Sequence, residues 1–313
     1  MLPIRWRDDE GLDELTGYLR RLAAWVDDVV VVDGSDPPRF DEHARRWTPS
    51  VRHLRPHPDL RFVSGKVNGV VTGVREAARE RVVIADDDVR YGEAALAEMA
   101  RLLGDCDVVA PQNHFDPLPW HAVWDTGRTL IARAVSHDMP GTVGVRRGPF
   151  LAMGGYDGDV LFENLELMRT ARAAGGVVAT PRDLFVRRLP PSAAHFWSQR
   201  VRQAYDEFAR PGRMAAALAL APAVALSRRP ARAAGALAVA SVALAEAGRR
   251  RDGGRRVFPV RTALAAPAWV AERAVCAWLA VGARLVRGGV PYGGVVMRRA
   301  ATPSRRLRAR AAS

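Results

Sequence analysis

Three consecutive aspartates, Asp86 to Asp88, follow the apolar run from Val82 to Ala85. Two carboxylates two residues apart, on a turn after a strand, can face one side and share a divalent cation. Mg²⁺ and Mn²⁺ prefer such oxygen ligands and commonly take further ligands from substrate phosphates. Aspartate also favours the position that caps the start of a helix. The triplet alone therefore fits either a metal site, with Asp86 and Asp88 as ligands, or a capped helix start.

Two further polar segments have residue types that suit a phosphate-bearing ligand. Asp33 follows the apolar run 29–32 and precedes Gly34 and Ser35, so it is either a second strand-end carboxylate or part of a plain β-turn. Lys66 lies in the segment 64–69, which opens a helix. A helix start offers free backbone N–H groups to a phosphate, and a lysine there adds a positive charge. Lys66 is the only lysine among 47 basic residues, which favours a specific role.

Short apolar runs and helical patterns alternate over the first 210 residues and position these side chains. This alternation predicts an α/β domain with a mostly parallel sheet and helices on both faces. In such a sheet, ligands bind beyond the carboxyl ends of the strands, where both Asp33 and Asp86 fall. The strands expected are 2–6, 29–32, 82–85, 107–110, 142–146 and 177–180, and the helices expected are 12–27, 67–79, 94–103 and 164–174.

The charge of the chain is unevenly distributed. The 313 residues carry a net charge of +13, but residues 1–210 carry −3 and residues 211–313 carry +16. Because the main part of the chain does not share the positive charge, nucleic acid is not an expected partner.

Two cysteines, Cys106 and Cys276, are too few for a disulfide scaffold. The first residues contain no apolar stretch of the kind found in a secretory signal peptide.

Residues 211–302 form an Ala/Arg-rich region with helical segments at 214–227, 233–248 and 262–286. None offers the roughly 20 uninterrupted apolar residues of a membrane span. We expect helices that lie on, or dip into, the anionic cytoplasmic face of the cell membrane; the alternative is a soluble Ala-rich bundle. Residues 303–313 are expected to be a disordered basic end. The predicted division is thus 1–210, 211–302 and 303–313.

The order of the acidic and basic segments resembles that of the family 2 glycosyltransferases, which have the GT-A fold, a Rossmann-like α/β fold. The resemblance covers about residues 1–210. It implies a nucleotide-sugar donor (UDP- or GDP-linked), Mg²⁺ or Mn²⁺, a hydroxyl acceptor and inversion at the sugar. By this resemblance Asp33 contacts the nucleoside, and Lys66 with Asn68 belongs to a shortened GK-x-x-x-x-N-x-G stretch. Asp86, Asp87 and Asp88 resemble the DxD motif that binds the donor and the metal.

The segment 162–167, with the glycines at 175 and 176, resembles the ED-x-[DE]-L…R…AGG block of the same family. The family's catalytic aspartate is replaced here by Asn164. An amide cannot accept a proton, so Asn164 cannot be the general base. Either Glu163 or Glu166 must then serve as the base; Glu163 is the expected one, and Glu166 is also expected on the acceptor side. A phosphate acceptor, which is already ionised, would need no base.

Gln199 and Arg202 resemble the Q-x-x-R-W motif of the ceramide-glucosyltransferase and synthase branches, although Gln203 replaces the tryptophan. The resemblance places Gln199 and Arg202 near the diphosphate or the acceptor. Trp124 and Arg128 belong to an aromatic and polar cluster that either faces the acceptor or forms an edge of the core. Basic apolar tails recur in members that use lipid acceptors, which implies a lipid-linked or membrane-proximal acceptor.

Two other functions fit parts of the pattern. A nucleotidyltransferase acting on sugar phosphates shares the strand-end carboxylates and the metal. Such enzymes have a Gly/Arg-rich phosphate loop after the first strand, and the residues from Arg5 to Asp8 contain no glycine. A degenerate transferase fold that serves as a membrane adaptor is favoured by Asn164 and Gln203.

Overall fold

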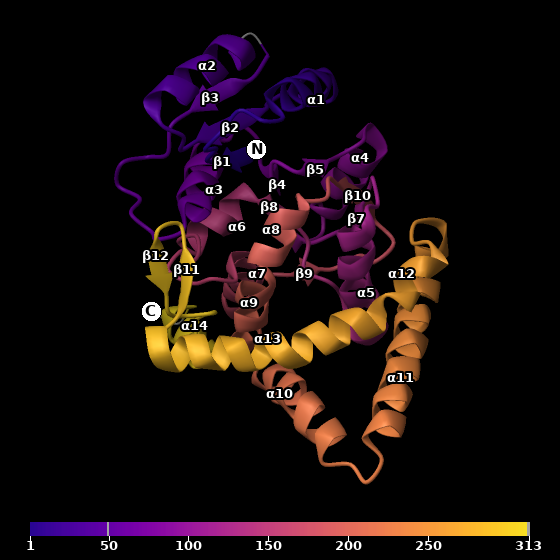
Figure 1. Cartoon of the computed structure of the whole chain (residues 1–313). Coiled ribbons are helices and arrows are strands. Elements are labelled where there is room, and N and C mark those ends of the chain that lie inside the picture. Colours follow the sequence, from indigo (N-terminus) through magenta and orange to yellow (C-terminus); the bar gives the residue numbers. More distant parts are fainter. Residues whose placement is uncertain (49, 312–313) are drawn as a thin grey trace. The chain divides into compact units, whose positions relative to one another are not determined.

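The computed structural model describes residues 1–48 and 50–311 (Figure 1), and they form two compact units. The first unit comprises Met1–Ala110, Pro140–Ala179 and the C-terminal segment from Thr302. The second comprises Pro111–Met139 and Thr180–Ala301. These units differ from the division at residue 210 that the sequence predicts. The helices between residues 211 and 287 share a unit with residues 111–139 and 180–210.

The first unit has an α/β architecture. Its elements are β1 (Leu2–Ile4), α1 (Leu12–Trp25), β2 (Val30–Asp33), α2 (Pro37–Trp47), β3 (Arg52–Leu54), α3 (Gly65–Glu76), β4 (Arg81–Ala85), β5 (Val89–Arg90), α4 (Glu93–Leu102), β6 (Val108–Val109), β8 (Thr142–Arg146), α6 (Arg147–Ala152), α7 (Glu163–Ala173), β9 (Val178–Ala179) and α14 (Ser304–Ala311). Strands β1, β2 and β3 are parallel neighbours, and β4, β8, β6 and β9 form a second sheet. Only β8 runs against its neighbours in that sheet. The predicted α/β fold is confirmed.

The core of the first unit fixes the strands that carry the polar turns. Leu15 and Leu19 of α1 are buried against Val31 of β2 and against Trp47 at the end of α2. Helix α3 also lies close to β1, because a Cβ placed on Gly69 would come within 2.8 Å of Pro3. A larger residue would push the start of α3 away from β1, so Gly69 helps to set the position of Lys66.

The second unit is mostly helical. Its elements are β7 (Gln112–Phe115), α5 (Trp120–Val135), β10 (Phe185–Arg188), α8 (Ala193–Ser198), α9 (Arg200–Tyr205), the 3₁₀ helix η1 (Asp206–Ala209), α10 (Pro211–Ala225), α11 (Pro230–Arg250), the 3₁₀ helix η2 (Gly254–Arg256), α12 (Val260–Leu264), α13 (Ala266–Arg287), β11 (Val290–Tyr292) and β12 (Val295–Met297). Figure 1 shows α10 and α11 meeting at a sharp turn and α13 running across their other ends. The predicted helical C-terminal region is therefore present.

Small residues explain why the C-terminal helices join residues 111–139 in one unit. A Cβ on Gly248 of α11 would lie 1.9 Å from the carbonyl oxygen of Leu130 in α5, so the two helices touch through their backbones. Ala266 contacts Gly127 of α5 in the same way. Leu130, Ala266 and Phe258 are buried together in the resulting core. Such contacts need glycine and alanine at chosen positions, which the Ala-rich composition alone does not specify.

The C-terminal segment differs from the disordered end that the sequence predicts. Residues Ser304–Ala311 form helix α14 in the first unit, where it contacts α7. Leu307 of α14 is buried, and the Ser304 hydroxyl accepts a hydrogen bond of 2.7 Å from Arg169 in α7. A buried leucine and polar contacts, including an ion pair of Arg310 with Asp157, thus order a segment whose composition is otherwise basic. The predicted end continues to residue 313, and residues 312–313 lie outside those described.

Candidate active site

The carboxyl ends of β1, β2 and β4 lie side by side in the first unit. Trp6, two residues after the end of β1, connects the turn that follows β2 with the turn that follows β4. Its backbone N–H donates to the hydroxyl of Ser35 at 2.9 Å, and its indole N–H donates to the carboxylate of Asp87. The N–H of Gly34 also bonds the carbonyl of Ile4 at 2.9 Å. The two acidic turns that the sequence singles out therefore share one edge of the fold.

Lys66 connects two of the predicted site residues. Its ammonium lies 2.6 Å from a carboxylate oxygen of Asp86 and 2.9 Å from one of Glu163. Burial alone would lower the pKa of Lys66, but the charges of Asp86 and Glu163 outweigh it and raise this pKa well above its usual range. The lysine is therefore held in its charged form between two carboxylates that are 77 residues apart in sequence.

The start of α3 presents Lys66 to these carboxylates. Ser64 is the N-cap residue, and its hydroxyl accepts from the N–H of Val67. Asn68 closes the loop before the helix, because its amide accepts from the N–H of Phe62 and donates to the Phe62 carbonyl, both at 3.0 Å. The structure thus gives Asn68 a role in shaping the loop rather than a direct donor contact. The predicted donor contact of Asn68 stays a prediction.

Asp86, Asp87 and Asp88 form a tight turn after β4. The N–H of Val89 bonds the carbonyl of Asp86 at 3.0 Å, and the N–H of Asp86 bonds the carbonyl of Gly141. All three aspartate side chains are partly accessible to solvent. This set offers only carboxylate oxygens, which are the ligands that Mg²⁺ and Mn²⁺ prefer. The residue types present therefore fit the predicted cation, and Asp88 and Asp86 as its ligands stay a prediction.

Glu163 begins α7, where a carboxylate is favoured by the helix dipole, and its side chain is 15% exposed. The neighbouring Asn164 turns elsewhere, and its amide donates to the carbonyl of Pro140 at 2.8 Å. Asn164 thus anchors the loop before β8. Glu163 is the carboxylate that contacts Lys66 in this part of the site. Its predicted role as the general base stays a prediction.

Asp33 has a different environment from the one that the sequence predicts. Its side chain is completely buried, and one carboxylate oxygen contacts His43 at 2.6 Å and His53 at 3.1 Å. The other oxygen accepts from the N–H of Ser35 at 2.8 Å. Burial would raise the pKa of Asp33, but these hydrogen bonds hold it well below its usual range. These bonds hold the turn after β2, and a nucleoside could contact Asp33 only if it replaced one of them. The predicted nucleoside contact of Asp33 stays a prediction.

Glu166 does not lie where an acceptor could reach it. It is 0% exposed, and its carboxylate accepts from the backbone N–H of Thr302 at 2.9 Å. The hydroxyl of Thr302 contacts Asp157 at 3.3 Å. The structure therefore does not support the predicted acceptor role of Glu166. This glutamate instead attaches the C-terminal segment to the first unit.

We expect Glu166→Gln to lower the free energy of unfolding by about 1–2 kcal/mol, because a charge-assisted hydrogen bond to Thr302 becomes a neutral one. Chemical denaturation measures the change. Glu98→Gln, which affects an exposed pair with Arg101, is the control and should cost less than about 0.5 kcal/mol. Equal stability of Glu166→Gln and the wild type would contradict the attachment role.

The remaining predicted residues belong to the second unit, which is described by itself. Arg128 is paired with Asp138, and the rings of Trp124 and Trp197 are 5.8 Å apart. Arg202 stacks on the ring of Tyr292. The amide of Gln199 donates to the hydroxyl of its neighbour at 3.2 Å. Their predicted place around the donor and acceptor stays a prediction.

Sequence reasoning missed the residues that link the strand ends. The linking role of Trp6 could have been suspected from its position, because it follows the first strand as Ser35 follows the second. Arg5 is exposed, and its side chain lies next to Gly65 at the start of α3. His43 and His53 gave no signal in the sequence, because a single histidine on a helix or a strand has no spacing pattern. Only the fold shows that both histidines contact Asp33.

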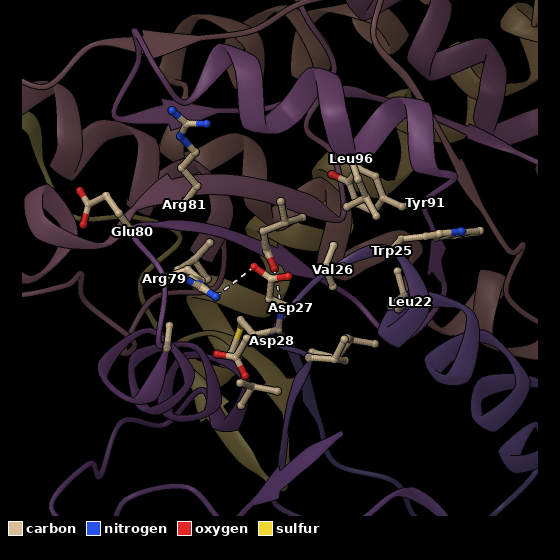
Figure 2. A pocket seen from close by; sticks show the side chains of 18 of the residues that line it. Leu22, Trp25, Val26, Asp27, Asp28, Arg79, Glu80, Arg81, Tyr91 and Leu96 are labelled. Carbon is tan, nitrogen blue, oxygen red and sulfur yellow. Dashed lines mark hydrogen bonds and ion pairs between the residues drawn. The ribbon is translucent and has the colours of Figure 1, made fainter. Parts of the chain in front are cut away.

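A groove of about 560 Å³ opens at the other end of the strands (Figure 2). It is lined by the first residues of β1, β2 and β4, with Leu22 and Trp25 of α1 on one wall and an ion pair between Asp27 and Arg79 on another. Because ligands of α/β sheets bind beyond the carboxyl ends of the strands, the groove is not the predicted donor site. The polar turns that carry Asp33 and Asp86 lie at the opposite ends.

No protein-family model and no curated protein matches the sequence. Among solved structures, the mannosyltransferase PcManGT from Pyrobaculum calidifontis, in complex with GDP-mannose and Mn²⁺, aligns with a TM-score of 0.50 and 19% identity over 88% of this chain and 85% of its own. The fold is that of the GT-A glycosyltransferases. Glucosyl-3-phosphoglycerate synthase from Mycobacterium tuberculosis aligns with a TM-score of 0.44 and 14% identity, over 62% of this chain and 72% of its own. TarS (residues 1–349) from S. aureus aligns with a TM-score of 0.42 and 13% identity, over 65% and 63%.

Proposed function

We propose that this GT-A chain is a metal-dependent glycosyltransferase that moves a sugar from a nucleotide sugar to a hydroxyl acceptor with inversion. The observation that carries the proposal is the contact of Lys66 with both Asp86 and Glu163. One cation-binding turn, one lysine at a helix start and one candidate base thereby meet at the carboxyl ends of the strands. The mannosyltransferase of the same fold binds GDP-mannose and Mn²⁺, so a GDP- or UDP-linked donor is proposed.

The diphosphate of the donor would bind between the turn formed by Asp86, Asp87 and Asp88 (the DDD turn) and the start of α3. Asp88 and Asp86 would hold Mg²⁺ or Mn²⁺, which supplies positive charge for the leaving nucleoside diphosphate. Lys66 adds a second positive charge on the same side, and the exposed side chain of Arg5 beside Gly65 adds a third. The N–H groups at the start of α3 suit the same anion.

Glu163 would remove the proton from the acceptor hydroxyl, which then attacks the anomeric carbon from the face opposite the leaving group. Without a donor, the carboxylate of Glu163 is engaged by the ammonium of Lys66 at 2.9 Å. When the donor binds, its phosphates compete for Lys66, and this exchange would free Glu163 for the acceptor. Lys66 thereby connects donor binding to activation of the base.

The acceptor side is proposed from the second unit. Trp124 and Arg128 of α5 and the Gln199–Arg202 segment are proposed for the acceptor, on the resemblance of Gln199 and Arg202 to the Q-x-x-R-W motif. The tryptophan rings suit the apolar face of a sugar. A lipid-linked acceptor is proposed because the same unit carries the apolar and basic C-terminal helices. Residues 1–210 contain all the polar side chains assigned to the donor and the acceptor.

Many apolar side chains of the C-terminal helices are exposed and lie among arginines, as expected for a protein at an anionic membrane surface. Within the described residues, Pro230–Arg250 and Val260–Arg287 have the length and composition to cross a membrane, and buried helices of soluble proteins can have the same features. We propose peripheral binding at the cytoplasmic face. The large exposed apolar residues of these helices and of the turn between α10 and α11 are Leu226, Val239, Leu244, Val260, Leu264, Val275, Trp278, Leu279, Leu285 and Val286.

The turn between α10 and α11 should contribute to this binding. Leu226 is 86% exposed there and is followed by Arg228 and Arg229. We expect Leu226→Asp to weaken co-sedimentation with vesicles of phosphatidylcholine and phosphatidylglycerol at least about tenfold, because the lost leucine burial is worth about 1.5–3 kcal/mol. Val177→Asp, at an exposed position of the first unit, is the control. Unchanged binding of Leu226→Asp would contradict membrane contact by this turn.

The proposed activity is tested by a donor screen for release of free nucleoside diphosphate in the presence of Mn²⁺, beginning with GDP-mannose. We expect one donor to be turned over, and Asp88→Ala to reduce turnover at least about 100-fold. Asp59→Ala, which removes an exposed partner of Arg75, should leave turnover unchanged. No turnover of any nucleotide sugar, together with no effect of Asp88→Ala on donor binding, would overturn the proposal.

An adaptor function is the second candidate, because Asn164 has a structural contact in place of a catalytic one. Thermal unfolding with nucleotide sugars separates the two functions. Stabilisation that requires Mn²⁺ supports the enzyme. Binding to anionic vesicles without any response to nucleotide sugars supports the adaptor.

A further inference from the structure

A second cluster of possible metal ligands lies apart from the DDD turn. Asp33 at the end of β2, His43 of α2 and His53 of β3 each direct one donor atom toward the others, and the three atoms lie within 4.8 Å of one another. The side chains of Asp33 and His43 are 0% exposed, and that of His53 is 2% exposed. The cluster therefore joins three elements of the first unit in a site closed to solvent.

We propose that Asp33, His43 and His53 bind a Zn²⁺ ion. Imidazole nitrogens with one carboxylate oxygen form a typical zinc ligand set, and three protein ligands leave a fourth position for a small ligand such as water. Two ligands of a tetrahedral zinc ion are about 3.3 Å apart, given bonds of about 2.0–2.1 Å. The carboxylate oxygen of Asp33 is 3.1 Å from the ring nitrogen of His53 and 2.6 Å from that of His43. The distance between Asp33 and His43 would therefore lengthen by about 0.7 Å when an ion binds.

The surroundings of the cluster hold the three side chains in place. The second ring nitrogen of His43 lies 3.3 Å from the carboxylate of Asp9. A carboxylate behind a metal-bound histidine is the usual outer-shell arrangement, because it fixes the ring and its proton. The N–H of Ser35 binds the carboxylate oxygen of Asp33 that faces away from the histidines. These contacts leave one carboxylate oxygen of Asp33 and one imidazole nitrogen of each histidine close together, within 4.8 Å of one another.

Aromatic rings form the walls of the cluster. His43 stacks on Trp47 with ring centres 4.5 Å apart, and His53 stacks on Phe40 at 4.2 Å. Nδ1 of His53 is buried and has no hydrogen-bond partner among residues 1–48 and 50–311, so the only polar contact of this ring is the one with Asp33. Both rings are thus held with one nitrogen toward Asp33. Hydrogen bonding between the three residues without an ion is the competing explanation.

This site has a different chemistry from that of the DDD turn. Asp86 and Asp88 offer only oxygen atoms and suit Mg²⁺ or Mn²⁺, whereas two imidazoles favour Zn²⁺ and similar ions. The zinc proposal does not rest on the proposed enzymatic function. A zinc ion here would fix the turn after β2 next to α2 and β3.

Cobalt serves as the probe, because four-coordinate Co²⁺ gives visible absorption that six-coordinate Co²⁺ lacks at comparable strength. The full chain is stripped with a chelator and titrated with Co²⁺ in the absence of nucleotide sugar. We expect one Co²⁺ per chain with the four-coordinate spectrum, and its loss when Zn²⁺ is added. Asp88→Asn should bind Co²⁺ in the same way, whereas His43→Ala should lose the spectrum.

Two further variants make the test specific. His57→Ala, which removes a histidine paired with Glu76 outside the cluster, should leave the spectrum unchanged. Asp9→Asn should weaken Co²⁺ binding roughly 10- to 100-fold, as expected for an outer-shell partner. If neither the wild type nor Asp88→Asn shows the four-coordinate spectrum, the zinc proposal is overturned. That result needs no variant of the cluster to fold, and it leaves the donor screen unaffected.

Discussion

Replacement of Lys66 by methionine is expected to reduce both stability and activity. Lys66 is 18% exposed, and the carboxylates of Asp86 and Glu163 that it contacts are 20% and 15% exposed. Without the ammonium, two carboxylates that are mostly buried lose their common partner. Removal of one member of a buried ion pair strongly destabilises a fold, so we expect a loss of about 2–4 kcal/mol in the free energy of unfolding. Chemical denaturation of the variant measures this loss.

Turnover of the donor should fall at least about 100-fold in the same variant, since a positive charge is lost where negative charge develops. The double variant Lys66→Met with Glu163→Gln separates the two effects. It removes one of the stranded charges, so stability should partly recover while turnover stays low. Arg79→Met, which affects an exposed pair with Asp27, is the control for both measurements. A Lys66→Met protein as stable as the wild type would show that the lysine does not hold the two carboxylates.

The positions of the main strands and helices in the first unit follow from local sequence. Apolar runs at 29–32 and 82–85 correspond to β2 and β4, and the spacing of leucines in 12–27 corresponds to α1. These patterns suffice because a buried strand needs only a continuous apolar run, and an amphipathic helix needs only a periodic one. The strand ends are then fixed, so the carboxylates of Asp33 and Asp86 were correctly placed at them.

The partners of these carboxylates depend on contacts that a local pattern does not contain. Asp33 meets two histidines because α2 and β3 bring them to the end of β2. Glu166 is covered by Thr302, which lies 136 residues later in the chain. In both cases the sequence pattern predicts an accessible carboxylate, but residues of other elements bury it. Only the fold shows which acidic side chains remain accessible.

The extent of the two units was also beyond the sequence patterns. The change of composition at residue 210 suggests a boundary there, but helix packing depends on shape rather than on composition. Gly127 and Gly248 allow α5, α11 and the start of α13 to approach closely, which joins segments on both sides of residue 210. A glycine within a helical pattern shows that close contact is possible, but it does not identify the partner.

Asp125→Asn is the second substitution for which we expect a large effect, this time on the second unit. Asp125 of α5 lies 3.1 Å from the guanidinium of Arg200, which is also 3.4 Å from the carboxylate of Glu272 in α13. All three side chains are less than 10% exposed. The substitution leaves Arg200 with a single charged partner, so we expect a loss of about 2–3 kcal/mol in the free energy of unfolding.

The pH dependence of this loss follows from the pKa of Asp125. Burial raises this pKa, but the charges of Arg128 and Arg200 outweigh burial and hold it below its usual range. A depressed carboxylate pKa stabilises the fold above the unfolded-state value of about 3.9, and this contribution is lost as the pH falls through the lower folded-state value. The difference in stability between wild type and Asp125→Asn should thus be constant from about pH 5 to 8 and shrink below about pH 4.

Urea unfolding at a series of pH values, followed by tryptophan fluorescence, measures that difference. Asp116→Asn is the matched control, because Asp116 forms an exposed pair with Arg187 at 3.1 Å in the same unit, and it should cost less than about 0.5 kcal/mol at every pH. A double-mutant cycle with Arg200→Met should give a coupling energy of about 1–3 kcal/mol, since the two side chains are in direct contact. A difference between wild type and Asp125→Asn that grows as the pH falls below 4 would contradict the ion pair, because protonation of Asp125 should make the two proteins more alike.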